Sequence, residues 1–150
     1  VGVAGVKAVA KPKPKPKPKA ASGGSGSSSS AAGSRSYSTS ITGRCGSIGL
    51  TSNAARLCSA VQSAYGLSSI GGYRPNAGEH STGQAVDFMI SGRGQGDAIA
   101  AFVQSHAGQF NVEYVIWRQR YWVPGAGWDP MSDRGSATAN HYDHVHVTVN

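Results

Sequence analysis

Lysine is absent from residues 41–150, and acidic residues are absent from residues 1–40. The net charge of +7 therefore belongs to the first forty residues, because the remainder balances its arginines with Asp and Glu. A nucleic-acid-binding domain would carry its positive charge on a folded face. The chain also lacks any apolar run close to the roughly 20 residues that a membrane span needs. We therefore expect neither a nucleic-acid partner nor a membrane span.

Cysteine is scarce as well: Cys45 and Cys58 are the only two, so one intrachain pairing is possible. Disulfides persist mainly outside the cytosol. A bridge around so short a loop stabilises a fold by roughly 3 kcal/mol in the chain-entropy model. The alternative is a pair of reduced cysteines, one of them buried in a helix. We predict the disulfide, and with it a protein that is secreted or associated with a cell wall.

Two kinds of sequence divide the chain. Residues 11–19 alternate Lys and Pro, which favours an extended polyproline-like segment. Residues 20–40 are almost all Ser, Gly and Ala, a composition that cannot bury a core. We predict a disordered linker over 1–40 and one folded domain over 41–150, and we expect a monomer. The linker is either a plain spacer or a spacer whose lysines bind an anionic wall polymer.

Hydrophobic periodicity predicts an α+β domain with helices on one side of a small, mainly antiparallel sheet. Helices are expected over about 53–65 and 97–106. Strands are expected over 70–74, 84–90, 112–117, 120–123 and 143–149. The stretch 124–140 is expected to form a loop.

The last predicted strand carries the clearest functional signal. Its three valines share one face, which leaves His144, His146 and Thr148 on the other. Two neighbouring imidazoles repel each other when both are charged, and a shared metal ion removes that conflict. A surface strand with chance histidines is the alternative, but four of the five histidines fall at positions 80, 141, 144 and 146.

Asp87 lies in the middle of the predicted strand 84–90, turned away from its apolar face. A carboxylate in such a strand is costly unless it is paired or binds a metal. It either pairs with an arginine such as Arg74 or joins the histidines. Two imidazoles and a carboxylate can form a zinc site with a position open for water. The same set holds iron in non-haem oxygenases, but their His-x-Asp spacing is absent here.

The run from His80 to Asp87 follows the pattern His-x-x-Gly-x-Ala-x-Asp. This pattern resembles the zinc D-Ala-D-Ala peptidases of the hedgehog-like fold. The closing His-x-x-His-x-His, residues 141–146, is similar to the murein endopeptidases of that superfamily. The stretch 133–147 also resembles a C-terminal domain of secreted actinobacterial proteins. The likeness covers residues 70–150 at most.

The resemblance assigns roles to individual residues. The implied zinc ligands are His80, Asp87 and His146. Arg74, in the run Gly-Tyr-Arg-Pro, would contact the scissile carbonyl. The family's general base is usually a Glu three residues before the last ligand, where this chain has Asp143. Because His144 faces the ligand side of its strand, we favour His144 as the base, with Asp143 and His141 as alternatives.

The resemblance implies a secreted zinc metallopeptidase that hydrolyses an amide bond in peptidoglycan peptides, as a carboxypeptidase or an endopeptidase. The alternative is a catalytically inactive, zinc-containing module that binds the cell wall. Four aromatic residues either border a substrate groove or pack in the core and the hairpin: Trp117, Tyr121, Trp122 and Trp128. His106, at the end of a predicted helix, suits the helix dipole and is left out of the site.

Overall fold

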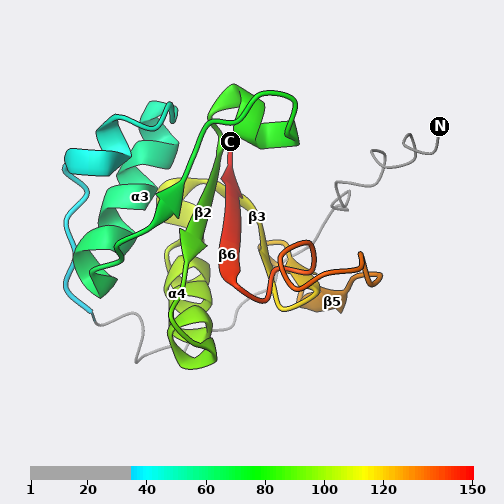
Figure 1. The fold of residues 1–150 in the computed structure, drawn as a ribbon. Coiled ribbons are helices and arrows are strands. Elements are labelled where there is room, and N and C mark those ends of the chain that lie inside the picture. The colour runs from blue at the N-terminus through cyan, green and yellow to red at the C-terminus, as the bar shows by residue number, and fades with distance from the viewer. Residues whose placement is uncertain (1–34) are drawn as a thin grey trace.

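One antiparallel sheet of six strands organises residues 35–150, which are the residues that this computed structural model describes. The strands lie in the order β1-β2-β6-β3-β4-β5. Their bounds are β1 Ile70–Gly71, β2 Ala85–Met89, β3 Val112–Trp117, β4 Arg120–Trp122, β5 Trp128–Pro130 and β6 His144–Val149. The last strand, β6, therefore lies in the interior of the sheet, between β2 and β3 (Figure 1).

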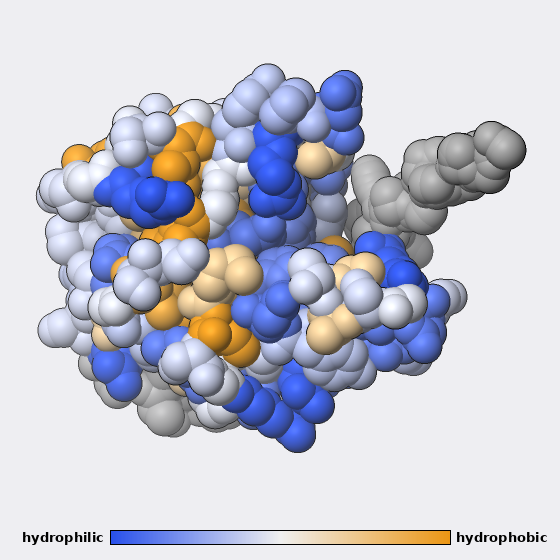
Figure 2. Space-filling model, in the orientation of Figure 1, coloured by the Kyte–Doolittle hydropathy of each residue, from blue (hydrophilic) through white to orange (hydrophobic). Residues whose placement is uncertain are grey.

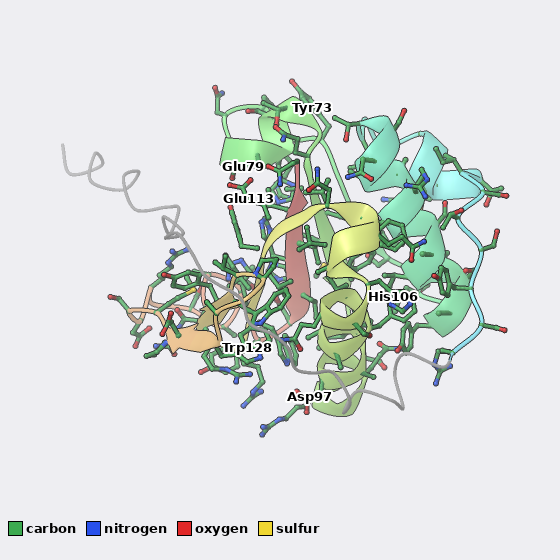
Figure 3. The ribbon with its side chains drawn as sticks, turned by 180° about the vertical axis from the view of Figure 1, so that it is seen from behind. Tyr73, Glu79, Asp97, His106, Glu113 and Trp128 are labelled. Carbon is green, nitrogen blue, oxygen red and sulfur yellow. A yellow bond between two sulfur atoms is a disulfide. The ribbon has the colours of Figure 1, made fainter. Side chains whose placement is uncertain are left out.

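Helices cover one face of this sheet. They are α3, Ser52–Tyr65, α4, Arg93–Ser105, and the short α5, Ala107–Phe110. Their buried side chains share one core with the three valines of β6 and with Trp117 of β3. Figure 1 shows α4 behind the end of β2 and to one side of β6, and in Figure 3, seen from behind, α4 lies toward the viewer. The predicted α+β class, with helices on one side of an antiparallel sheet, is confirmed.

The element boundaries follow local chemistry. Thr51 begins α3 because its side-chain oxygen accepts a hydrogen bond from the backbone N–H of Ala54, the third residue of the helix, and Gly66 ends the helix in the left-handed conformation. Helix α4 starts at Arg93, before the predicted start at Asp97, because its first turn, Arg-Gly-Gln-Gly, has no apolar residue to mark it. The stretch 124–140, predicted as a loop, contains β5, which pairs with β4. That strand is too short to show alternation.

Gly96 gives the indole ring of Trp117 room to pack on α4, and Trp117 Nε1–H donates to Asp97 Oδ1 at 2.8 Å. A Cβ at position 96 would overlap the ring. Gly96→Ala should therefore lower the free energy of unfolding by about 1–3 kcal/mol, the usual cost of overpacking. Gly94→Ala in the same helix is the control, because its Cβ meets nothing within 4 Å. Urea unfolding should show no loss for the control, and an unchanged Gly96→Ala would contradict the packing.

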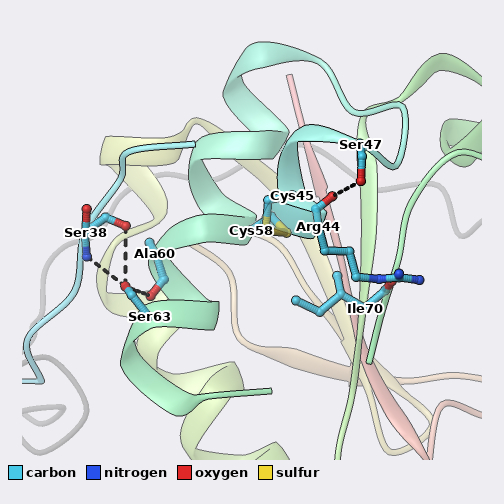
Figure 4. The surroundings of a disulfide bond; sticks show 8 residues. All are labelled: Ser38, Arg44, Cys45, Ser47, Cys58, Ala60, Ser63 and Ile70. Atoms are coloured by element: carbon cyan, nitrogen blue, oxygen red, sulfur yellow. Dashed lines mark hydrogen bonds between the residues drawn. A yellow bond between two sulfur atoms is a disulfide. The ribbon is translucent and has the colours of Figure 1, made fainter. Parts of the chain in front are cut away.

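The predicted disulfide is present. It joins Cys45, in the 3₁₀ helix η2, Gly43–Gly46, to Cys58 in the middle of α3, with 5.7 Å between the Cα atoms (Figure 4). Both cysteines are buried. The same segment is tied to the sheet because Arg44 Nε–H donates to the Ile70 carbonyl at 2.8 Å. Within residues 35–150, no helix has the length and apolar character needed to cross a membrane.

The folded region extends to the N-terminal side of the predicted boundary at residue 41. Arg35 donates to the Ala64 carbonyl at 3.0 Å and lies over the ring of Tyr65. The ring of Tyr37 meets Phe102 edge to face, at 5.2 Å between centroids. Of the linker predicted over 1–40, these last residues belong to the domain, and 1–34 lie outside the described residues.

Two truncations measure this contribution. The free energy of unfolding should be about 1–3 kcal/mol lower for a chain that begins at residue 41 than for a chain that begins at residue 35. The shorter chain loses the ring contacts of Tyr37 and the pairing of Arg35 with α3. Both chains should bind the same amount of metal, since the candidate ligands lie far along the sequence. Equal melting temperatures would show that residues 35–40 add nothing.

Candidate metal centre

The sheet face opposite the helices carries the predicted site residues. Strand pairing places Asp87 of β2 directly opposite His146 of β6, and Ile116 of β3 on the other side of His146. His144 lies further along β6, opposite Met89. The register of two strand pairs therefore gathers residues that are far apart in the sequence.

His80 reaches this face from the short 3₁₀ helix η3, Gly78–Thr82. Its Nδ1 lies 2.9 Å from the Gly72 carbonyl oxygen. Because a carbonyl only accepts, Nδ1 carries the proton and Nε2 of the neutral ring has a lone pair. Nε2 is buried without a hydrogen-bond partner among the described residues, and it lies 3.3 Å from Asp87 Oδ2. A buried lone pair beside a carboxylate is stabilised by a cation.

His80, Asp87 and His146 place their ligand atoms within 4.8 Å of one another, and all three side chains are buried. The two imidazole rings meet edge to face, with 5.1 Å between centroids. Two imidazole nitrogens and a carboxylate oxygen are a donor set that zinc takes in catalytic sites. The structure thus brings together the three predicted ligands, and their donor atoms fit a zinc ion.

Contacts with the disulfide-bearing segment hold the loop that carries His80. Tyr73 N–H donates to the Ile48 carbonyl, and Thr51 N–H donates to the Gly83 carbonyl, at 2.8 and 2.9 Å. Gly83 has a φ of +78°, and a Cβ there would collide with the backbone just before Thr51. The position of the His80 loop therefore depends on the segment that the disulfide ties down.

Burial and neighbouring rings set the charge in this site. Burial alone raises the pKa of Asp87, but the hydrogen bond with His146 and the nearby rings of His80 and His144 outweigh it. The pKa of this carboxyl is therefore held well below its usual range. Burial lowers the pKa of His146 despite the carboxylate beside it. A carboxylate and a neutral imidazole are the protonation states that metal binding requires.

Arg74 joins the centre through Asp87. Its Nη1 donates to Asp87 Oδ2 at 3.1 Å, and its side chain is half exposed. Gly71, opposite Asp87 in β1, brings no side chain between the two. Asp87 was predicted either to pair with an arginine or to join the histidines. The structure shows both arrangements, because Asp87 contacts Arg74 as well as His80 and His146.

His144 and Asp143 form a pair at the edge of the centre. His144 Nδ1 lies 2.7 Å from Asp143 Oδ1, and His144 Nε2 lies 3.7 Å from Asp87 Oδ1. The other Asp143 oxygen accepts a hydrogen bond from Thr138 Oγ1 at 2.7 Å. The hydrogen bond with His144 lowers the pKa of Asp143. Asp143 is therefore turned toward His144, and His144 is turned toward the candidate ligands.

His141, the remaining alternative base, also lies against the centre. Its ring centroid is 4.6 Å from that of His144 and 5.6 Å from that of His146. Burial, reinforced by these two imidazoles, lowers the pKa of His141 to about 3. The residue has a left-handed φ of +58°, and its carbonyl accepts the N–H of Arg118 in the β3–β4 turn. The hairpin turn therefore fixes the backbone at His141.

Three residues beside the centre were not predicted as site residues. Thr148 Oγ1 lies 2.9 Å from His146 Nε2. The ring of Tyr114 stacks on His146 at 5.8 Å, and its hydroxyl donates to Glu79 Oε1 at 2.9 Å. Burial raises the pKa of Tyr114 well above its usual range. The sequence places Thr148 on the histidine face, but only the strand register reveals Tyr114, opposite Thr148.

Of the two alternatives for the aromatic residues, a substrate groove or packing in the core, the structure shows core packing for Trp117. Trp117 is 1% exposed and packs in the core against α4, on the helix side of the sheet. Trp122 and Trp128 are partly buried and pack against that core. His106, which the prediction left out of the site, stacks on Phe102 with 4.2 Å between centroids. Hydrophilic residues gather between η3 and the segment after β5 on the face in view in Figure 2.

Comparisons with known proteins identify a family that matches this chain. The family model described as "VldE, C-terminal domain" matches residues 46–142. An "Uncharacterized secreted protein" of Arthroderma benhamiae is 31% identical over 94 residues, which cover 45% of this chain and 38% of that protein. The chain thus spans well under half of that relative's length. No solved structure matches the chain.

The secreted relative and the Cys45–Cys58 disulfide agree with an extracellular protein, so the predicted location is confirmed. The matched residues include His80 and Asp87 and stop just before β6. Because the match covers more than half of its length, the chain belongs to the family of VldE C-terminal domains.

Proposed function

We propose that this protein is a zinc-dependent peptidase that acts outside the cell on an amide bond of peptidoglycan peptides. The observation that carries the proposal is the convergence of three buried ligand atoms, from His80, Asp87 and His146, beside the ring of His144. The motif likeness to zinc D-Ala-D-Ala peptidases supplies the reaction and the substrate class. The disulfide and the secreted relative support an extracellular substrate.

The residues around the centre have complementary roles in such a hydrolysis. A zinc ion held by the three ligands would polarise the scissile carbonyl and make an attacking water more acidic. His144, held at Nδ1 by Asp143, takes a proton from that water through Nε2 and passes it to the leaving amine. The water oxygen bonds to the carbonyl carbon, the C–N bond breaks, and a carboxylate and an amine result. The half-exposed guanidinium of Arg74 stabilises the charge on the carbonyl oxygen.

Purified sacculi are the direct substrate for a test. We expect the zinc-loaded protein to release soluble muropeptides, with release stopped by a chelator and restored by zinc. Mass analysis of the new ends would identify the bond that is cut. Zinc-dependent binding to sacculi without product release would overturn hydrolysis and favour the non-catalytic wall-binding module instead.

We also propose that the lysines of residues 1–34 bind an anionic polymer of the cell wall. Their charge suits an anionic wall polymer, and such binding would weaken as salt screens exposed charges.

A further inference from the structure

One peptide group connects the disulfide-bearing segment to the candidate centre. Its carbonyl, from Gly72, lies 2.9 Å from His80 Nδ1, and its N–H, from Tyr73, donates to the Ile48 carbonyl at 2.8 Å. The two groups point in opposite directions from one rigid trans plane. The position of Ile48 therefore sets the direction of the carbonyl that holds the His80 ring, whose other nitrogen faces Asp87.

The far end of the loop that carries His80 is held by the same segment. The Gly83 carbonyl accepts a hydrogen bond from Thr51 N–H at 2.9 Å. A Cβ at Gly83 would lie 2.6 Å from the Gly49 carbonyl oxygen, so the close approach requires a glycine. Residues 48–51 therefore hold the loop on both sides of His80.

The disulfide fixes this segment against α3. The bond between Cys45 and Cys58 closes a ring of the chain that contains residues 48–51, and Cys58 lies in the middle of the helix (Figure 4). In the absence of the bridge, the hydrogen bond from Arg44 to the Ile70 carbonyl remains near that end of the segment. One hydrogen bond restricts the segment less than a covalent bridge does. Opening the bridge therefore loosens the residues that orient the His80 loop.

We propose that the Cys45–Cys58 disulfide makes metal binding depend on oxidation. In the oxidised chain the Gly72 carbonyl keeps the Nδ1 proton of His80 and aims Nε2 at the metal position, as outer partners of metal-ligating histidines generally do. A dithiol reductant breaks the S–S bond by giving two electrons and two protons, so both cysteines become thiols and the reductant becomes a disulfide. The loosened segment then no longer fixes the Gly72 carbonyl, and zinc affinity falls. The inference rests on the zinc centre proposed above.

Burial decides when this dependence acts. Cys45 is 2% exposed and Cys58 is fully buried, so a reductant reaches the bridge only when the segment opens. Once formed, the bridge is protected. The dependence therefore acts as the protein matures: the chain completes its metal site in an oxidising compartment, which agrees with its extracellular location.

Zinc affinity of the full chain, measured by competition with a chelator, tests this dependence. The double variant Cys45→Ala/Cys58→Ala lacks the bridge and leaves no cysteine thiol that could bind zinc itself. We expect its zinc affinity to be about 10- to 100-fold lower than that of the oxidised wild type, the usual cost of losing an outer partner of a ligand. Circular dichroism checks that the variant is folded.

Two glycine variants that keep the bridge sharpen the test. Gly72→Ala places a Cβ 2.5 Å from the Ile48 carbonyl oxygen, so it should displace the peptide group and lower zinc affinity to a similar degree. Gly96→Ala is the control for lost stability, because its Cβ would meet Trp117 beside α4 and not the His80 loop. This control should bind zinc like the wild type.

Amide hydrogen exchange of the metal-free chains separates the dependence from the zinc centre. The N–H groups of Tyr73 and Thr51 should exchange faster in the double variant than in the oxidised wild type. Equal exchange, or equal zinc affinity in a folded double variant, would overturn the dependence and leave the zinc centre intact. If the double variant does not fold, unchanged zinc affinity in Gly72→Ala would overturn it instead. A wild type that binds no zinc would overturn the proposed centre and the dependence together.

Discussion

Purified protein should carry about one zinc ion per chain, and His146→Ala and His80→Ala should carry almost none. Each substitution removes one of the three proposed ligands and leaves a buried carboxylate, Asp87, with fewer partners. The loss should exceed the roughly 10- to 100-fold weakening that follows from removing an outer partner of a ligand. Elemental analysis after dialysis against a weak chelator gives the stoichiometry.

His106→Gln is the matched control for this experiment. His106 is a partly buried histidine whose Nδ1 contacts the Phe102 carbonyl at 2.8 Å, in the helical layer rather than on the ligand face. The variant should keep the zinc content of the wild type. Equal zinc in wild type and His146→Ala would show that the cluster of three buried side chains is not the metal site.

The second large effect concerns turnover rather than metal. His144→Ala should retain zinc, because His144 is not among the three converging ligands. It should lower turnover on a soluble peptide about 100- to 10,000-fold, which is the usual contribution of a positioned base. Asp143→Ala should cost less, since Asp143 acts by orienting His144 through a 2.7 Å contact.

Zinc content and turnover, measured on the same preparations, separate the two residues. Asp143→Asn keeps the size of the side chain and an oxygen that can accept from His144, so its turnover should lie above that of Asp143→Ala. Abolished activity in Asp143→Ala together with a mild effect in His144→Ala would show that Asp143 itself is the base. His144 would then face the proposed ligands without acting as the general base.

The alternation of side chains in β2 and β6 was enough to predict which residues of these strands lie on the sheet face opposite the helices. The valines of β6 fill the core, so His144 and His146 had to share the opposite face. Asp87 follows from the same rule in β2. A period of two residues is a local property of the backbone, and for that reason the sequence displays it.

Register is not local, and it accounts for what the sequence could not predict. That Asp87 lies opposite His146, and Tyr114 opposite Thr148, depends on how β2, β3 and β6 align. The same limit hid the hydrogen bond between Tyr114 and Glu79, because the two residues meet only through the fold.

Residues with little local signal account for the other differences. The first turn of α4 contains glycines, one of which, Gly96, is there to admit the Trp117 ring. Trp117 itself was open to two interpretations, since an indole suits both a groove and a core. The three-residue strand β5 is too short to display a period.

Anomalous scattering from crystals of the zinc-loaded protein, collected on both sides of the zinc absorption edge, tests the central claim most directly. One strong peak is predicted, bonded to His80 Nε2, to a carboxylate oxygen of Asp87 and to a ring nitrogen of His146. The absence of a peak there, or a zinc ion bound by other residues, would contradict the account.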